Sequence, residues 1–357
     1  MSNLFKRLEG ERGVFKEESA LMPDYIPEVL PHREREVKEI ASALMPASRG
    51  RKPENMILVG TPGTGKTACS RYVLRELAEY SKNVVPVYIN CWEFSTRHGV
   101  LSEIVSALGE ILPRRGISTD EITAKIVEVL KKEKKTPVVV LDELDRLFAS
   151  QYGEEKVLYD LARAGEVFSV NIGVLGITNN KELLAKIDAR VKSSLAQKQI
   201  EFGKYSPVQL KDILKERAKL SFFPLVLEEE VIPLCAAVGA KNNGDARLAI
   251  ATLWKAGRNA EKEGKEKVSV EHAKEAANEA NAELRKERAD SLSEMEKKIL
   301  EVLKKKGELM SSELYELLGE SDRTVRFYLV RLEKSGLIET EEKIGKEGRT
   351  RKIKIKK

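Results

Sequence analysis

The sequence predicts an α/β domain with a parallel sheet of five strands, then an all-helical domain, then a C-terminal domain of three helices and a β-hairpin. Three observations predict this architecture. Five short β-branched runs alternate with helical segments up to residue 202. From Ser206 to about Arg285 only helical patterns remain, and from about Ser291 three amphipathic helical segments precede a basic, alternating strand pattern. We therefore expect domains at residues 1–203, 204–285 and 290–357.

Length and composition limit the classes of protein to which the chain can belong. Its 357 residues suit two or three domains, and 41% apolar with 34% charged residues exclude wholesale disorder. The chain lacks a run of about 18 apolar residues, and its N-terminus lacks the apolar core of a signal peptide. Three distant cysteines and three histidines favour neither a disulfide framework nor a zinc site. We expect a soluble, cytoplasmic protein without membrane contact.

The five predicted strands are short and almost wholly apolar. They cover residues 56–59, 84–90, 138–141, 172–177 and 199–202. Strands that lack a polar face are typical of a parallel sheet covered by helices on both sides. The strands therefore form the centre of the first domain, and the segments between them supply the covering helices.

A phosphate-binding loop follows the first predicted strand. Residues 60–67 fit G-x-x-x-x-G-K-[ST], and a helix is expected to start near Ala68. In this pattern backbone N–H groups face phosphate oxygens, Lys66 neutralises phosphate charge and the Thr67 hydroxyl binds Mg²⁺. An ordinary glycine-rich turn is the alternative, which the position between strand and helix disfavours. The predicted ATP/ADP and Mg²⁺ site comprises Gly60, Thr61, Pro62, Gly63, Thr64, Gly65, Lys66, Thr67 and Ala68.

Two carboxylates follow the third predicted strand. At the tip of a strand beside the P-loop, Asp142 would hold Mg²⁺, and Glu143 would act as the base that polarises the attacking water. A strand-end cap is the alternative for such a pair. The P-loop about 75 residues upstream favours the catalytic interpretation.

An amide and two arginines complete the candidate ATPase site. Asn179 follows the fourth strand and would orient the hydrolytic water, with a turn asparagine as the alternative. Arg190 and Arg247 each stand next to a polar turn, and an arginine aimed at a γ-phosphate stabilises transition-state charge. For any single arginine a surface role is the default. The predicted catalytic residues are Glu143, Asn179, Arg190 and Arg247, of which Arg247 also contacts the nucleotide.

Three helix signals open the C-terminal domain. Ser293 and Glu296 form a capping box before an apolar series that ends at Gly307. A short second helix starts at Ser311, and Ser321 caps a third helix whose apolar residues share one face. A turn at 345–348 and an alternating strand at 352–356 follow. This order predicts the winged-helix form of the helix-turn-helix.

Basic charge is concentrated at the C-terminal end. Residues 321–357 contain twelve basic and six acidic residues and so carry the whole net charge of +6. Such asymmetry favours an anionic partner, most often nucleic acid, and a winged helix presents its third helix to the major groove. A solvated charged tail and a winged helix used for protein contacts remain alternatives. The predicted DNA contacts are Arg323, Thr324, Arg326, Lys346, Arg349 and Arg351.

These motifs, taken in chain order, resemble those of the AAA+ ATPases. The sequence more closely resembles the archaeal replication initiators related to the origin recognition complex and the cell-division-control loader. Besides the P-loop and the D-E pair, the resemblance rests on short segments and the winged helix. The segments are LPHRERE at 30–36, INC at 89–91, GITN at 176–179, RVKSSL at 190–195 and GDAR at 244–247.

The resemblance implies roles within the nucleotide site. Asn179 would be sensor 1, Arg190 the arginine finger that serves a neighbouring subunit, and Arg247 sensor 2. The segment before the P-loop would form the adenine pocket with Tyr25, Ile26 and Arg33. A helical insert that touches DNA would fall within residues 92–117, which contain Arg97, His98, Arg114 and Arg115.

The resemblance also implies a function. The chain would bind duplex DNA at replication origins in an ATP-dependent manner, associate with itself on DNA and help to load the replicative helicase, with slow hydrolysis as a switch. It would lie on the nucleoid in the cytoplasm. Three alternatives stay open: a P-loop ATPase that regulates transcription or signalling, a protein-assembly module, and a paralogue that does not mark origins.

Overall fold

The chain folds into two compact units that divide between Ala277 and Asn278. The computed structural model describes residues 13–113, 116–149, 153–183, 192–193, 195, 198–290, 292–334, 337–345 and 348–355. The division falls inside the helix α13 (Val270–Asp290). The predicted end of the second domain, residue 285, lies within the same helix. No helix in these ranges is long and apolar enough to span a membrane.

Five parallel strands form the centre of the first unit, which confirms the predicted sheet. The strand order is β2-β3-β4-β1-β5. The strands are β1 (Met56–Gly60), β2 (Val84–Asn90), β3 (Thr136–Asp142), β4 (Gly173–Thr178) and β5 (Lys198–Phe202). Because β4 lies between β1 and β3, the residues that follow these three strands meet at one edge of the sheet.

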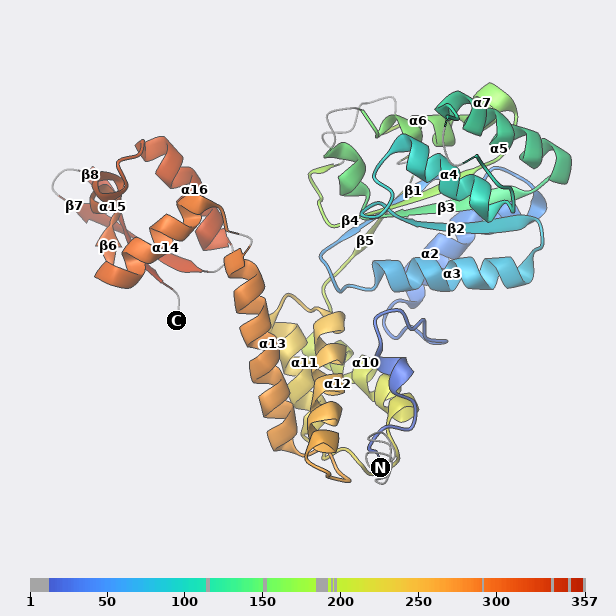
Figure 1. Ribbon diagram of the computed structural model, residues 1–357. Coiled ribbons are helices and arrows are strands. Elements are labelled where there is room, and N and C mark those ends of the chain that lie inside the picture. Colours follow the sequence, from blue (N-terminus) through green and yellow to red (C-terminus); the bar gives the residue numbers. More distant parts are fainter. Residues whose placement is uncertain are drawn as a thin grey trace, which may run out of the picture. The chain divides into compact units, whose positions relative to one another are not determined.

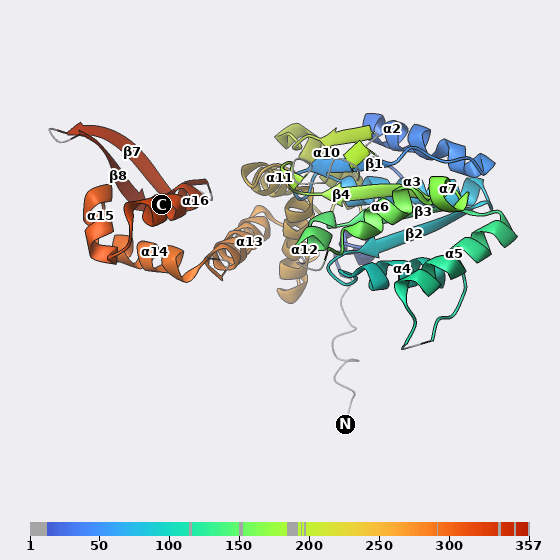
Figure 2. The same cartoon turned by 90° about the horizontal axis from the view of Figure 1, so that it is seen from above.

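Helices cover both faces of the sheet because its central strands are apolar on both sides. Met56 and Leu58 pack in one core with α2 and α3, whereas Ile57 and Val59 pack in another with α4 to α7. Figure 1 shows these two helical layers, and Figure 2 shows α4 beside the edge strand β2. The helices are α2 (Glu34–Leu44), α3 (Lys66–Tyr80), α4 (Arg97–Ala107), α5 (Thr119–Glu133), α6 (Lys156–Ala162) and α7 (Ala164–Phe168), with 3-10 turns η1 (Glu18–Leu21), η2 (Met45–Arg49) and η3 (Leu144–Phe148).

A helical lid follows β5 in the same unit. It contains α10 (Pro207–Ser221), α11 (Val231–Lys241), α12 (Ala246–Lys262) and the first part of α13, which share one apolar core. A capping box between Ser206 and Gln209 starts α10, and Asp245 is the N-cap of α12. The segment before α2 joins this core, since the Phe15 and Phe222 rings lie 4.8 Å apart.

The second unit confirms the predicted winged helix. Three helices precede an antiparallel hairpin, and a short strand extends the sheet to the order β6-β8-β7. The predicted capping box between Ser293 and Glu296 is present. Residues 281–290, which precede the predicted winged helix, belong to α13. The elements are α14 (Glu294–Lys306), β6 (Leu309–Met310), α15 (Ser311–Leu318), α16 (Asp322–Lys334), β7 (Ile338–Gly345) and β8 (Gly348–Ile355).

Candidate functional site

The P-loop links β1 to α3 at the edge where β1, β4 and β3 end. Gly60 ends β1, and α3 begins at Lys66, two residues before the predicted start at Ala68. Gly63 and Gly65 have φ angles of 74° and 93°, a region in which other residues are strained. The loop therefore needs glycine at both positions, and it presents the N-terminus of a 15-residue helix to a ligand.

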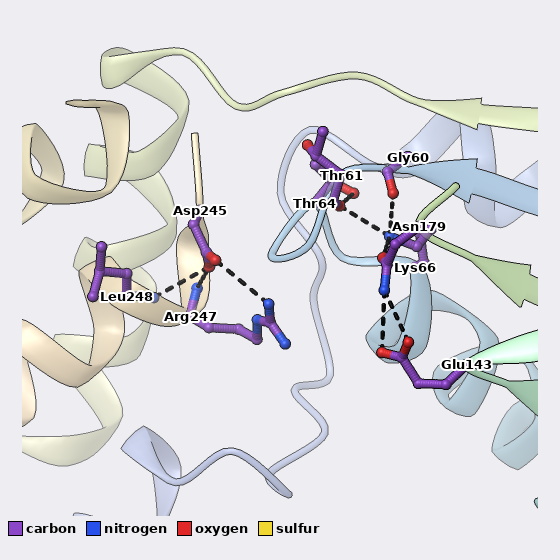
Figure 3. Close-up of polar contacts among 9 residues, drawn as sticks. All are labelled: Gly60, Thr61, Thr64, Lys66, Glu143, Asn179, Asp245, Arg247 and Leu248. Carbon is purple, nitrogen blue, oxygen red and sulfur yellow. Dashed lines mark hydrogen bonds and ion pairs between the residues drawn. The ribbon is translucent and has the colours of Figure 1, made fainter. Parts of the chain in front are cut away.

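The Lys66 ammonium is buried and fully hydrogen-bonded. Its Nζ donates to the backbone oxygens of Gly60 and Thr61 at 2.8 and 2.9 Å. Its third hydrogen bond, of 2.9 Å, goes to Asn179 Oδ1 across the end of β4 (Figure 3). Burial lowers the pKa of Lys66 to about 8, an effect that the Asp142 carboxylate opposes and the Arg247 guanidinium reinforces.

Asn179 connects the P-loop lysine to the proposed base. While its oxygen accepts from Lys66, its Nδ2 donates to the two carboxylate oxygens of Glu143 at 3.1 and 3.0 Å. Glu143 itself has a φ of 55°, which is uncommon for a residue with a side chain. At this residue the backbone leaves the extended conformation of β3 and enters the turn η3. The amide thus fixes the Glu143 carboxylate at the same edge as the P-loop.

The Asp142 carboxylate lies against the first turn of α3. Its Oδ2 accepts from the Thr67 hydroxyl at 2.7 Å and from the Tyr88 hydroxyl at 2.6 Å. Its Oδ1 accepts from the Glu143 N–H at 2.9 Å. A buried carboxylate beside a hydroxyl is a set of oxygen ligands that suits Mg²⁺, so Thr67 and Asp142 fit the predicted metal site.

The loop also fits a nucleotide. Thr61 Oγ1 is buried and has no hydrogen-bond partner among the residues that the structure describes, so a donor or acceptor is available inside the loop. The Lys66 cation and the helix N-terminus suit phosphate groups. This set of donors therefore matches the predicted ATP/ADP site.

The lid reaches the P-loop through Asp245. The Ala246 N–H donates to the Gly63 oxygen at 3.1 Å, and a methyl group added to Gly63 would overlap the Asp245 carboxylate. Arg247 is exposed, and its Nη2 lies 3.4 Å from Asp245 Oδ2. In Figure 3 its side chain extends from α12 toward the side where Lys66 and Glu143 lie. Arg247 is therefore near the phosphate site without a direct contact to it.

Arg33, which the resemblance assigns to the adenine pocket, braces the P-loop. Its guanidinium is buried and donates from Nε to the Thr64 oxygen at 2.8 Å and from Nη2 to the Gly203 oxygen at 2.6 Å. It also stacks 3.9 Å from the centre of the Tyr205 ring. Since Gly203 and Tyr205 lead into the lid, Arg33 connects the P-loop to the start of the lid.

The other predicted pocket residues lie between α3 and the lid. The Ile26 oxygen accepts from Arg75 of α3 at 3.5 Å, and Arg217 of α10 stacks 4.7 Å from the centre of the Tyr25 ring. Both residues therefore lie between the α/β domain and the lid. Their role toward adenine stays a prediction. Arg190, the predicted finger, lies outside the described residues.

The structure describes part of the predicted DNA-binding surface. Arg323 is exposed in the first turn of α16, and the Thr324 hydroxyl lies 2.8 Å from that of Ser321. Arg326 Nε donates to the Tyr315 hydroxyl at 3.2 Å. Arg351 is exposed on β8. Lys346 and the side chain of Arg349 lie outside what the structure describes, and the DNA contacts stay predictions.

The predicted DNA-contacting insert at residues 92–117 contains α4 and, among the described residues, loop segments on either side of this helix. Arg97 begins α4, but its Nε donates to Asp160 at 2.8 Å and its backbone N–H to Glu154 at 2.6 Å. This arginine therefore ties α4 to α6. His98 is exposed, while Arg114 and Arg115 lie outside the described residues.

Two residues at the site had no assigned role from the sequence. Tyr88 bonds Asp142 because the β2–β3 register sets Tyr88 opposite Val140, two residues before the carboxylate. Burial raises the pKa of its hydroxyl well above the usual value, so it acts as a hydrogen-bond donor. In the sequence, Asp245 stood out only because it lies two positions before the predicted sensor arginine, Arg247. Its position at the start of a helix was the signal for an N-cap.

Three family descriptions match successive parts of the chain. Residues 49–184 match the family described as AAA domain, and residues 211–278 match the Cdc6 AAA+ ATPase-type lid domain. Residues 296–340 match the DeoR-like helix-turn-helix domain. The first unit is therefore an AAA+ ATPase base with its lid, and the second contains a helix-turn-helix.

Individual relatives cover most of the chain. It is 40% identical over 277 residues to the ORC1-type DNA replication protein 1 of Sulfurisphaera tokodaii, which spans 77% of this chain and 68% of the relative. It is 38% identical over 351 residues to the ORC1-type DNA replication protein 2 of Methanosarcina mazei, with 96% and 93% covered. The structure of the Aeropyrum pernix ORC1 protein in complex with DNA superposes with a TM-score of 0.75 at 34% identity, covering 97% and 94% of the two chains.

Proposed function

Since the chain belongs to the family of ORC1-type DNA replication proteins, we propose that it is a replication initiator that binds duplex DNA at origins under the control of ATP. The observation that carries this proposal is the similarity over 96% of the chain, which includes ATPase base, lid and winged helix. A relative solved in complex with DNA, at 34% identity, supports duplex DNA as the ligand. Loading of the replicative helicase and self-association on DNA are parts of the same proposal.

The P-loop residues bind and orient the nucleotide. Lys66 exchanges its backbone partners for phosphate oxygens, and the backbone N–H groups of the loop support it. Thr67 and Asp142 would hold Mg²⁺, which would neutralise charge on the phosphates when bound. The 2.7 Å bond between their oxygens keeps both ligands at the first turn of α3.

Glu143 and Asn179 act on the attacking water. Glu143 accepts a proton from the water, and Asn179 holds the carboxylate through its amide nitrogen. Because the same amide also accepts from Lys66, Asn179 responds to the phosphate group that Lys66 binds. This coupling would make the position of Glu143 depend on the group that Lys66 binds, which is what ATP hydrolysis used as a switch requires.

The position of the lid would depend on the nucleotide that is bound. Asp245 and Ala246 contact Gly63 of the P-loop, and Arg247 extends from the same first turn of α12. A ligand that contacts the P-loop and Arg247 together favours one lid position over others. Arg190 would act on the nucleotide of a neighbouring copy when several copies meet on DNA.

Genome-wide mapping of the bound protein tests the proposal. We expect the wild-type protein to concentrate at a few origins on the nucleoid, and the Lys66→Ala variant to show a changed occupancy. A matched control is Lys38→Ala, at an exposed position of α2 away from the P-loop. Binding confined to promoters would favour a transcriptional regulator, and no enrichment on DNA would favour a protein-assembly module. Either result would overturn the initiator role.

A further inference from the structure

The face of α16 that points away from the domain core is apolar at its centre. Val325, Leu329 and Leu332 are buried, whereas Phe327 and Val330 are 58% and 41% exposed. At 3.6 residues per turn Phe327 and Val330 lie about 60° apart, on the side of the helix opposite Val325. Two large apolar side chains on one exposed face of a short helix suggest a surface that another molecule covers.

The arginines beside this apolar pair are engaged with neighbours in the same domain. Arg326 donates to the Tyr315 hydroxyl, and Arg331 Nε lies 3.2 Å from Glu296 Oε1. Arg331 also lies 5.8 Å from the centre of the Phe327 ring. Phe327 and Val330 therefore form the middle of the outward face of α16. Arg326 and Arg331 lie along its borders, and Arg323 lies at its N-terminal end.

The charge around the pair identifies the occupant. Residues 321–357 carry a net charge of +6, and arginines border the apolar pair, so an anionic ligand is favoured over an apolar protein surface. In duplex DNA the C5-methyl group of thymine is an apolar group on the major-groove edge, and phenylalanine is among the side chains that contact it. The third helix of a helix-turn-helix lies in that groove.

We propose that Phe327 and Val330 read thymine by contacting its C5-methyl groups in the major groove. This proposal rests on the duplex-DNA binding proposed above and adds the chemistry by which the chain selects its site. It predicts a preference for thymine at the positions facing the middle of α16. It also makes these two residues determinants of specificity, while Arg323 and Arg326, which are exposed, supply affinity for any duplex.

The experiment replaces thymine by uracil, which keeps the hydrogen-bonding groups and lacks only the methyl group. A duplex is selected by the full-length wild-type protein from a random-core library, then prepared with thymine or with uracil throughout. We expect the wild type to bind the uracil duplex about fourfold more weakly for each methyl group that the two side chains no longer cover. The Phe327→Ala/Val330→Ala double variant should bind both duplexes equally.

Controls separate the methyl contact from other effects. Val208→Ala, at an apolar residue of α10 that is 68% exposed, should keep the wild-type ratio of the two affinities. The double variant should keep the wild-type circular dichroism and its binding to a scrambled duplex at low salt. Comparing the thymine-to-uracil ratio between proteins removes any effect of uracil on DNA flexibility.

Three kinds of result would overturn the proposal, and each has a different meaning. The wild type could bind the thymine and uracil duplexes tightly and with equal affinity, or the double variant could keep the wild-type ratio of these two affinities. Either result would show that the two side chains do not recognise the methyl group, and would leave DNA binding intact. An unchanged ratio with altered self-association would show that the face contacts protein. Failure of the wild type to bind any duplex at low salt would remove the DNA-binding function itself.

Discussion

Lys66 Nζ donates a 2.9 Å hydrogen bond to Asn179 Oδ1, although the two residues are 113 positions apart in the chain. The other end of the same amide holds the Glu143 carboxylate. A phosphate-binding cation, an amide and a candidate base therefore form one continuous network. Breaking it at different points should separate nucleotide binding from hydrolysis.

Lys66→Ala and Glu143→Gln should fail in different ways. Lys66→Ala removes the cation that faces phosphate, and the loss of a charged hydrogen bond should weaken ATP binding by about tenfold to 100-fold. Glu143→Gln should bind ATP with nearly the wild-type affinity and hydrolyse it about 100-fold to 10,000-fold more slowly. Equilibrium binding of a fluorescent ATP analogue and single-turnover hydrolysis measure the two effects. Equal losses of ATP affinity in both variants would rule out Glu143 as the base.

Nucleotide binding should depend on pH through Lys66. Burial lowers its pKa to about 8, so in the free protein the ammonium loses its proton as the pH rises through that value. Bound phosphate favours the charged form and raises the pKa again. Above pH 8, ADP binding should therefore take up nearly one proton, and the affinity should fall by up to about tenfold per pH unit.

Calorimetry measures this proton uptake directly. ADP is titrated at pH 8.5 without Mg²⁺, in the presence of EDTA, in buffers that differ in ionisation enthalpy. The slope of observed enthalpy against ionisation enthalpy gives the number of protons taken up. A slope near zero at pH 8.5 would show that Lys66 is already charged in the free protein and would contradict the shifted pKa.

A methyl group on Gly63 should disturb the contact between lid and P-loop. It would overlap Asp245 Oδ1, an oxygen that already accepts from the backbone N–H groups of Arg247 and Leu248. Gly63→Ala should therefore lower the free energy of unfolding by clearly more than about 1 kcal/mol and weaken ATP binding. Chemical denaturation and the ATP-binding assay check both effects.

Gly50→Ala is the matched control. Gly50 has a φ of 66°, close to the 74° of Gly63, but nothing lies within 4 Å of its added methyl group. This variant should show only the backbone strain, about 1 kcal/mol, with ATP affinity unchanged. If the two variants lose the same stability and the same affinity, the Asp245 contact has no effect on the P-loop.

The chemistry of the site could be predicted from the sequence because its parts follow apolar strands. Carboxyl ends of parallel strands share one edge, so a P-loop, a D-E pair and an asparagine after three such strands had to lie near one another. The strand order could not be predicted. Only the order β3-β4-β1 sets Asn179 between Lys66 and Glu143, within reach of both.

Contacts that depend on strand register also escaped prediction. The basic pattern of 352–356 was visible in the sequence, but its neutralising partners were not. In the hairpin, Glu339 lies opposite Lys354, and Lys354 Nζ is 3.3 Å from its carboxylate. Lys352 likewise pairs with Glu308. The net charge of the wing, the hairpin of β7 and β8, therefore depends on the register between its strands, which the sequence of neither strand specifies alone.

Arg247 and Arg190 should respond differently to protein concentration. Arg247 extends from the lid of the same chain toward the P-loop, so Arg247→Ala should weaken the response to nucleotide even in dilute monomer. Arg190, assigned by resemblance to a neighbouring copy, should matter only when copies meet on DNA. Hydrolysis rates are measured for both variants at nanomolar protein, with sedimentation to establish the monomer, and again with DNA. Equal loss in the monomer would contradict a role of Arg190 across subunits.

Loss of the wing cations should weaken DNA binding in proportion to the phosphates they neutralise. Replacing Lys346, Arg349 and Arg351 together by alanine should weaken binding to a selected and a scrambled duplex alike. It should also reduce the dependence of log affinity on log salt by roughly one unit for each phosphate that is no longer neutralised. Lys352→Ala/Lys354→Ala is the control, because these lysines already pair with carboxylates in the domain and should neutralise fewer phosphates. Affinities measured over a range of salt concentrations decide the matter: a triple variant with the parent's affinity and salt slope would mean that the wing does not contact DNA.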